Sequence, residues 1–274
     1  RMTIVDVFAE QAFAGNQLAV VHDAASLSSE QMQTIALETN FSETTFVTRL
    51  ATGEADVRIF TPTHELPFAG HPTLGTAWVL TGGEGSITLN LGAGAVPVSF
   101  RDGKGWLTAP AVEFGGLVSS EVAADLLNIS VDDLDADFPF RYAEVGPRFL
   151  IIGVRSLDVL KRVKINEALF ESLNTKGGVF SVFAFSPDAY SSEADFAARM
   201  FFAVDGIRED PATGSANAAF AAYLRELGVE SGERIVDQGV EINRPSRLYL
   251  RIGDELQVGG RVFSVLEGEL QQLP

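Results

Sequence analysis

The sequence contains no cysteine among its 274 residues. This absence excludes disulfide bonds, cysteine-ligated zinc or iron–sulfur centres, and a thiol nucleophile in catalysis. Histidine is scarce, and its three occurrences (His22, His64 and His71) lack the spacing of a metal site. No apolar run approaches the ~18 residues of a membrane-spanning helix. Thiol, metal and membrane-spanning classes therefore have no support in the sequence.

Basic residues are also few, because 20 Lys and Arg face 37 Asp and Glu for a net charge of −17. Such a surface repels phosphate backbones and anionic lipid, so we expect neither a nucleic-acid nor a membrane partner. The chain enters a strand pattern at Thr3 without a signal-peptide layout, which together with the lack of cysteine predicts a cytoplasmic protein. A hydrophobic content of 46% and 20 Phe predict a large packed core.

Helix and strand patterns alternate along the chain. Helices are expected over 28–39, 70–80, 119–127 and 215–227, with Ser28 or Ser29 as the first N-cap. Short strands are expected over 3–8, 18–21, 44–48, 55–60, 86–91, 95–100, 104–109, 149–154, 179–185, 198–204, 248–252, 255–258 and 261–267. The segment 110–116 is the best domain junction, which predicts domains 1–112 and 113–274. The sequence leaves open which domain the strand 261–267 joins.

One internal repeat stands out. Arg58-Ile59-Phe60 leads to a helix at Gly70, and Arg199-Met200-Phe201 leads to a helix at Gly214. Both helices are apolar nearly all round, which indicates that each is buried on every side. The repeat predicts an α+β protein of two similar domains, each with short strands around one buried helix.

The starts of these two helices hold the first candidate site residues. A helix N-terminus offers unpaired N–H groups and about half a positive charge, and glycine lets a ligand approach the backbone. Gly70, Gly214 and Ser215 therefore suit a small anion. Asp210 before Pro211 resembles an N-cap worth about 1 kcal/mol, a role compatible with facing a ligand. His71 is a poor N-cap, but a lone histidine is structural at least as often as catalytic.

Glu43 lies between Phe41 and Phe46, where a turn meets a strand. It either points to water or is partly desolvated, and a desolvated carboxyl has a raised pKa and can hold and return a proton. Ser42 and Ser215 lack the Gly-x-Ser-x-Gly elbow of serine hydrolases. The glycines at 92 and 94 precede a strand rather than a helix, so no dinucleotide site is expected.

Taken together, the chain closely resembles the PhzF family of phenazine-biosynthesis-like proteins. The resemblance runs nearly end to end and rests on the segments Val5-Asp6-Val7-Phe8, Phe13-Ala14-Gly15-Asn16, Asn40-Phe41-Ser42-Glu43-Thr44, Thr61-Pro62, Gly70-His71-Pro72-Thr73 and Asp210-Pro211-Ala212-Thr213-Gly214-Ser215-Ala216. It implies the diaminopimelate-epimerase-like fold, in which two similar domains each wrap a curved mixed sheet around a central helix. It also implies a cofactor-independent isomerase, in a homodimer, acting on a small anionic metabolite.

The resemblance assigns roles to single positions. It makes Glu43 the group that moves a proton, with His71 and Asp210 positioning the substrate and assisting. It places Asn16, Ser42, Gly70, Gly214 and Ser215 against the substrate. The two catalytic cysteines of related epimerases would fall near Ala69 and Thr213, so two-thiol racemisation is excluded here. Gln17 stands where the family usually has proline, which leaves the local substrate preference open.

Three alternatives remain at this point. One is an epimerase or isomerase of another amino-acid-like metabolite, using the same residues. Another is a non-catalytic module that binds a small ligand or a protein through an intact cleft. A hydrolase using Ser215 is disfavoured by the missing elbow and the missing base.

Overall fold

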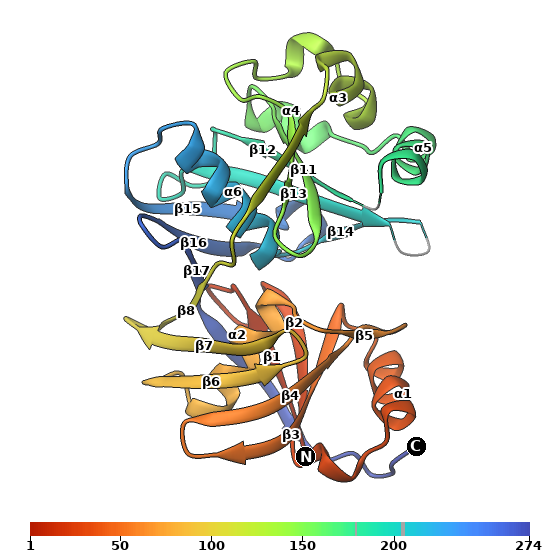
Figure 1. Cartoon of the computed structure of the whole chain (residues 1–274), viewed down its shortest axis with the longest axis vertical. Coiled ribbons are helices and arrows are strands. Elements are labelled where there is room, and N and C mark those ends of the chain that lie inside the picture. Colours follow the sequence, from red (N-terminus) through yellow and green to blue (C-terminus); the bar gives the residue numbers. More distant parts are fainter. Residues whose placement is uncertain (179, 204–205) are drawn as a thin grey trace. The chain divides into compact units, whose positions relative to one another are not determined.

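The computed structural model describes residues 1–178, 180–203 and 206–274, and the chain divides into two compact units. The first unit holds residues 1–108 and 258–274, and the second holds 109–257. Both termini therefore belong to the first unit (Figure 1). The expected strand start at Val179 and strand end at Val204 lie outside the described residues.

The elements of the first unit alternate strands with two helices. They are β1 (Met2–Val7), β2 (Asn16–Val21), the short 3-10 helix η1 (Ala24–Ser26), α1 (Ser29–Thr39), β3 (Glu43–Ala51), β4 (Glu54–Phe60), β5 (Glu65–Leu66), α2 (Gly70–Thr81), β6 (Ser86–Leu91), β7 (Gly94–Arg101), β8 (Lys104–Thr108) and β18 (Val262–Gly268). The chain returns to this unit through β17 (Gln257–Gly260).

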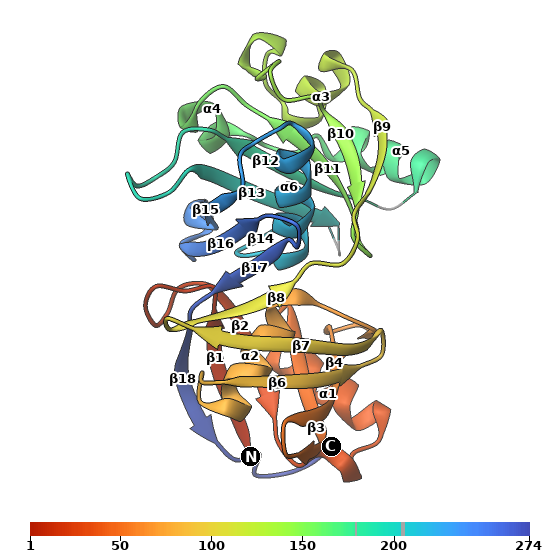
Figure 2. The same cartoon turned by 60° about the vertical axis from the view of Figure 1, so that its left-hand side comes forward.

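A curved mixed sheet in the first unit surrounds α2 (Figures 1 and 2). β1 pairs antiparallel with both β2 and β18, β2 runs parallel to β3, and β4 runs parallel to β6. Antiparallel pairs β3–β4, β6–β7 and β7–β8 complete the sheet. The last strand, whose place the sequence left open, thus pairs with the first one.

The position of α2 follows from its side chains. Every residue from Gly70 to Ala77 is buried, and the helix contacts β1, β2, β3, β6, β7 and β8. Gly75 faces the sheet so closely that a Cβ there would lie 2.6 Å from Leu18 Cδ2 and 2.7 Å from Val7 Cγ2. The expectation of a helix buried on all sides is met over these first two turns.

α1 covers another part of the first unit and begins with a full capping box. Ser28 Oγ accepts from the Gln31 N–H while Gln31 Oε1 accepts from the Ser28 N–H. Its buried residues pack on strand residues in a small cluster that contains Val21, Ala24, Met32, Ile35, Ala36, Phe46 and Phe60. This packing fixes the end of α1, from which the chain turns into β3.

The second unit repeats this plan with additional helices. Its elements are β9 (Glu113–Leu117), α3 (Ser120–Leu127), η2 (Val131–Asp133), β10 (Arg141–Glu144), β11 (Arg148–Gly153), α4 (Leu157–Arg162), α5 (Glu167–Gly177), β12 (Ser181–Ser186), β13 (Phe196–Ala203), β14 (Ile207–Asp210), α6 (Gly214–Glu226), β15 (Gly232–Gln238), η3 (Val240–Ile242) and β16 (Ser246–Ile252).

Strand pairing shows the duplication directly. Each unit contains an antiparallel pair, β1–β2 in the first and β10–β11 in the second. The chain then passes through a helical connection to a strand that runs parallel to the second strand of the pair, β3 beside β2 and β12 beside β11. The next strands, β4 and β13, each pair antiparallel with a short strand and run parallel to the strand that follows the central helix. The two copies of the Arg-x-Phe repeat lie at equivalent places in β4 and β13.

The central helix of the second unit is α6. Its residues from Ala216 to Leu224 are buried, and Phe220 is surrounded by the rings of Phe183, Phe185, Phe196 and Tyr223 at centroid distances of 4.5 to 6.3 Å. The helices α4 and α5 and the strands β5, β9, β10, β14 and β15 are absent from the sequence-based expectations. Among the described residues no helix has the length and apolar character needed to cross a membrane.

Candidate active site

Glu43 is placed by the end of α1. The helix stops at Asn40, whose left-handed backbone (φ 52°) turns the chain through Phe41 and Ser42 into β3. The hydroxyls of Thr39 and Thr44 lie 2.7 Å apart across this turn. Glu43 is therefore the first residue of β3, in parallel register with Leu18 of β2.

His71 is placed by the start of α2. Gly70 is the first helical residue, and the N-cap residue Ala69 has an extended backbone and no capping side chain. Thr73 Oγ1 donates to the Ala69 carbonyl oxygen at 2.7 Å. His71 is the second helical residue, and its side chain is only 6% exposed. The first turn of α2 thus presents its backbone N–H groups and this ring.

Glu43 and His71 contact each other. His71 Nε2 lies 3.5 Å from Glu43 Oε2, both atoms are buried, and 16% of the Glu43 side chain is exposed. Burial lowers the pKa of His71 from 6.5 to about 3, and a hydrogen bond with the Gln17 backbone offsets only part of that shift. The ring is therefore neutral at physiological pH, so this contact joins a carboxyl group to a neutral imidazole rather than forming an ion pair.

Asn16 completes this set of residues. Its Nδ2 lies 3.4 Å from His71 Nδ1, and the residue is 2% exposed at the start of β2. The turn before it requires Gly15, which has φ +70° and whose Cβ would lie 2.4 Å from the Val7 carbonyl oxygen. The structure thus brings three predicted residues of the first unit together: Asn16, Glu43 and His71.

The other predicted residues lie in the second unit. Asp210 ends β14 and is 7% exposed, and its Oδ2 accepts a hydrogen bond of 2.5 Å from Thr213 Oγ1. Gly214 and Ser215 are the first two residues of α6. The interpretation of Asp210 as the N-cap is wrong, because Thr213 occupies that position and the strand extends to Asp210. The chain needs three residues after β14 to turn into the helix.

Two residues of this second set escaped the sequence analysis. Gln238 and Asn217 are fully buried, and their amide groups contact Asp210, Thr213 and each other. The sequence does indicate a turn at Gln238-Gly239, because a polar residue before glycine at the end of a strand is typical of a turn. Sequence spacing alone does not place this turn against the start of α6.

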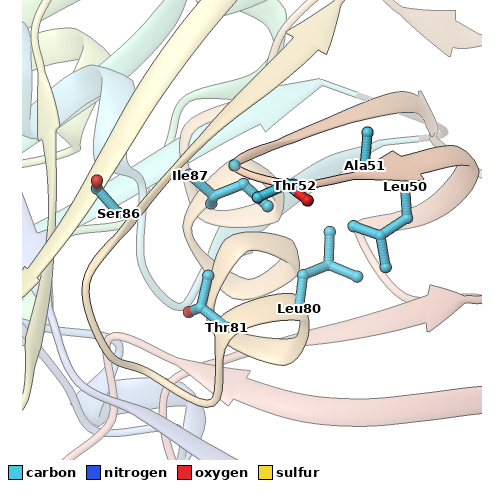
Figure 3. Close-up of a pocket in the computed structure, with 8 residues that line it drawn as sticks. Leu50, Ala51, Thr52, Leu80, Thr81, Ser86 and Ile87 are labelled. Carbon is cyan, nitrogen blue, oxygen red and sulfur yellow. The ribbon is translucent and has the colours of Figure 1, made fainter.

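A hollow of about 460 Å³ in the first unit is separate from these residues (Figure 3). It is lined by Leu50, Ala51, Thr52, Gly53, Leu80, Thr81, Ser86 and Ile87. These residues include the last residues of β3 and α2, whereas Glu43 and His71 stand at the first residues of the same elements. At 1.5 Å per residue, α2 separates its two ends by about 16 Å.

Comparison with known proteins identifies the family. The family model "Phenazine biosynthesis-like protein" matches residues 5–268. An uncharacterized isomerase of Pasteurella multocida is 36% identical over 97% of this chain and 92% of its own length. The trans-2,3-dihydro-3-hydroxyanthranilate isomerase of Pseudomonas aeruginosa is also 36% identical, over 92% of this chain and 90% of its own length.

Solved structures agree with the sequence relatives. The PhzF-family phenazine biosynthesis protein of Bacillus anthracis superposes with a TM-score of 0.88 at 28% identity, covering 99% of this chain and 98% of that one. A probable proline racemase from Agrobacterium radiobacter, at 13% identity and a TM-score of 0.61 over 98% and 93% of the chains, shares the fold alone. The expected α+β, diaminopimelate-epimerase-like fold is confirmed. The protein therefore belongs to the phenazine biosynthesis-like family and is an isomerase.

Proposed function

We propose that this isomerase moves a carbon-bound proton on a small carboxylate-bearing substrate without a cofactor, with Glu43 as the acid and base. The observation that carries the proposal is the contact of the buried Glu43 Oε2 with the neutral ring of His71 at 3.5 Å. A carboxyl group that accepts and returns a proton needs a position shielded from bulk water and a neighbour that tolerates both of its charge states.

The neutral ring of His71 satisfies the second need. An imidazole with one N–H and one lone pair can donate to a carboxylate or accept from a carboxylic acid, depending on its tautomer. Glu43 takes the proton as the C–H bond breaks, and the electron pair shifts into the adjoining π-system of the substrate. The carboxyl then returns the proton to a different carbon, so the substrate is isomerised and the enzyme is regenerated.

The helix start beside these residues suits the anionic end of the substrate. Gly70 begins α2 without a capping side chain, so the first-turn N–H groups and the helix dipole favour a carboxylate. Gly214 and Ser215 offer the same features at the start of α6, where Asp210 would assist. Ser42 and Asn16 adjoin Glu43 and His71 and would contact the ligand from the first unit.

The substrate itself has two candidates. The first is trans-2,3-dihydro-3-hydroxyanthranilate, because the Pseudomonas aeruginosa enzyme named for it is 36% identical. The second is another amino-acid-like carboxylate, since Gln17 in place of the usual proline leaves the local substrate preference open. The homodimer and the cytoplasmic location stay predictions that sedimentation and cell fractionation would test.

Deuterium exchange followed by NMR in D₂O tests this proposal. The protein is incubated with trans-2,3-dihydro-3-hydroxyanthranilate and with a panel of small amino and hydroxy acids. We expect deuterium uptake or isomerisation of at least one compound, and a loss of about 10²- to 10⁴-fold in Glu43→Gln, the range typical of acid–base groups. Glu43→Gln keeps the size of the side chain but removes its charge and its ability to exchange a proton.

Glu38→Gln is the matched control, because it makes the same change at an exposed residue of α1, five positions before Glu43. Its activity should equal that of the wild type. An unchanged rate in Glu43→Gln would overturn the proposed role of Glu43. Tight binding of a panel compound with no exchange would favour a non-catalytic binding module.

A further inference from the structure

The geometry points to Gln238 and Thr213 as positioning residues that orient the Asp210 carboxylate through a directed chain of hydrogen bonds. This inference rests on the proposed function, in which Asp210 assists the reaction. Neither residue is proposed to touch the substrate, and each acts through Asp210.

Gln238 is fully buried at the end of β15, and both halves of its amide are used. Its Nε2 donates to the Asp210 carbonyl oxygen at 2.9 Å and to Thr213 Oγ1 at 3.1 Å. Its Oε1 accepts from Asn217 Nδ2 at 3.0 Å. A flipped amide would set oxygen against the Asp210 carbonyl oxygen, so these contacts fix which end is the donor.

The direction of the chain follows from counting protons. A hydroxyl group has one proton to donate, and the amide nitrogen of Gln238 is only a donor. Thr213 Oγ1 therefore accepts a hydrogen bond from Gln238 Nε2 and donates its own proton to Asp210 Oδ2, which lies 2.5 Å away. Asp210 Oδ2 is the acceptor in this arrangement, which orients the carboxyl group toward Thr213.

The N-cap position of Thr213 makes this contact informative. A threonine at the N-cap ordinarily accepts from a first-turn N–H and stabilises the helix by roughly 1 kcal/mol. Here Thr213 is the N-cap residue of α6, yet its side chain makes no capping bond and turns to Asp210 instead. The Thr213 hydroxyl therefore bonds to the Asp210 carboxylate instead of forming the local capping bond that would stabilise α6.

The backbone after Gln238 packs against the loop that joins β14 to α6. Gly239 has φ +75°, and a Cβ on it would lie 2.5 Å from the Pro211 carbonyl oxygen. The turn that follows β15 therefore packs directly on the segment between Asp210 and Thr213. Asn217 also binds this loop, because its Nδ2 donates to the Thr213 carbonyl oxygen at 3.0 Å.

The test compares variants that remove single links. Gln238→Glu keeps the size and one oxygen but removes the donor, and Thr213→Val keeps the shape but removes the hydroxyl. We expect each to lower kcat/KM by about 10- to 100-fold, the range for a misplaced catalytic group. Thr213→Ser should restore activity to about a third of wild type or better, because it restores the hydroxyl.

The double variant Gln238→Glu/Thr213→Val separates positioning from general damage. Two substitutions that break one chain should together cost no more than the worse single one, whereas independent losses multiply. Ser246→Ala is the matched control, since Ser246 is buried, pairs with Gln238 across the strands, and has a hydroxyl that donates to the Arg244 carbonyl oxygen. Multiplying losses, full activity in Thr213→Val, or an equal loss in Ser246→Ala would overturn the inference.

A second readout does not depend on turnover. Each Gln238 Nε2 proton has its own acceptor, so Thr213→Val should shift one side-chain amide proton in the ¹H–¹⁵N spectrum and leave its partner nearly in place. Amide protons that do not shift would contradict the proposed chain of hydrogen bonds from Gln238 through Thr213 to Asp210. If the wild type is inactive on every compound, the proposed function fails while this spectrum still decides whether the chain exists.

Discussion

His71 Nε2 lies 3.5 Å from Glu43 Oε2, and burial keeps the histidine ring neutral despite that neighbour. An ionised carboxylate at this distance would favour the protonated imidazolium. Desolvation of the ring outweighs that attraction and lowers the pKa of His71 to about 3. The pair therefore carries at most the single charge of the carboxylate, which suits the proposed binding of an anionic substrate.

A first prediction concerns the charge state of His71. Because its pKa is lowered to about 3, its ring resonances should stay constant from pH 8 to pH 5. ¹H–¹⁵N NMR of the imidazole groups measures this, and the spectrum of His71→Gln identifies which signal belongs to this residue. A titration with a midpoint near the ordinary value of about 6.5 would show that the ring becomes charged in the folded protein.

A second prediction concerns stability against pH. His71 has a lower pKa folded than unfolded, so below pH 6.5 the unfolded chain binds a proton that the folded protein does not. The folded state therefore loses stability as pH falls from 6.5 toward 3, by about 1.4 kcal/mol per pH unit and about 2 kcal/mol between pH 6.5 and 5.

Urea unfolding of the wild type and His71→Gln at several pH values measures this loss. Trp78 and Trp106 both belong to the first unit, so tryptophan fluorescence follows the unit that contains His71. The free energy of unfolding of His71→Gln should fall less steeply between pH 6.5 and 5 than that of the wild type. Parallel curves would contradict a buried neutral histidine.

Much of the fold is predictable because local patterns and tertiary packing agree. The capping residues of α1, the two buried central helices and the Arg-x-Phe repeat all follow from residue types and spacing. The helices α4 and α5 are harder to predict from local pattern. α4 has six residues, and the apolar residues of both helices contribute to a cluster formed with distant strands. β15 is similar, since five of its seven residues are polar or glycine.

The site is predictable to a different extent. Residue identity and motif order single out Glu43, His71 and Asp210, but not how each is held. The loop after β14 decides that Thr213 rather than Asp210 takes the N-cap position, and tertiary contacts with β15 decide where the Thr213 hydroxyl points. Burial of His71 likewise depends on strands distant in sequence, so the sequence leaves its charge open.

A third prediction concerns the close packing of α2 against the sheet of the first unit. Gly→Ala in a helix ordinarily stabilises by up to about 1 kcal/mol. At Gly75 a new Cβ would lie 2.6 Å from Leu18 Cδ2 and 2.7 Å from Val7 Cγ2, so Gly75→Ala should instead destabilise the first unit by about 1–3 kcal/mol. The shift of α2 should also lower activity, because His71 lies on the same helix.

Gly116→Ala provides the comparison for that variant, because no atom lies within 4 Å of the Cβ it would add. Far-ultraviolet circular dichroism in urea, which reports on both units, compares both variants with the wild type, and deuterium exchange compares their activity. A Gly75→Ala protein as stable as the wild type would show that α2 has room to adjust.

A fourth prediction concerns a buried ion pair in the second unit. Arg199 donates from Nη2 and Nε to Glu209 at 2.6 and 3.0 Å, and from Nη1 to carbonyl oxygens at the end of α4. Both charged side chains are less than a tenth exposed. Arg199→Met would leave the Glu209 carboxylate buried without its partner, so it should destabilise the protein by about 3–5 kcal/mol.

Two further variants decide whether the buried charge is the cause. Adding Glu209→Gln to Arg199→Met should recover part of the lost stability, because the uncompensated carboxylate is then gone. Arg49→Met breaks an exposed pair with Glu54 and Asp56 and should change stability little. Far-ultraviolet circular dichroism in urea measures all three. A double variant no more stable than Arg199→Met would assign the loss to the α4 carbonyl groups and Glu241, which lose Arg199 in both variants, rather than to the Glu209 carboxylate.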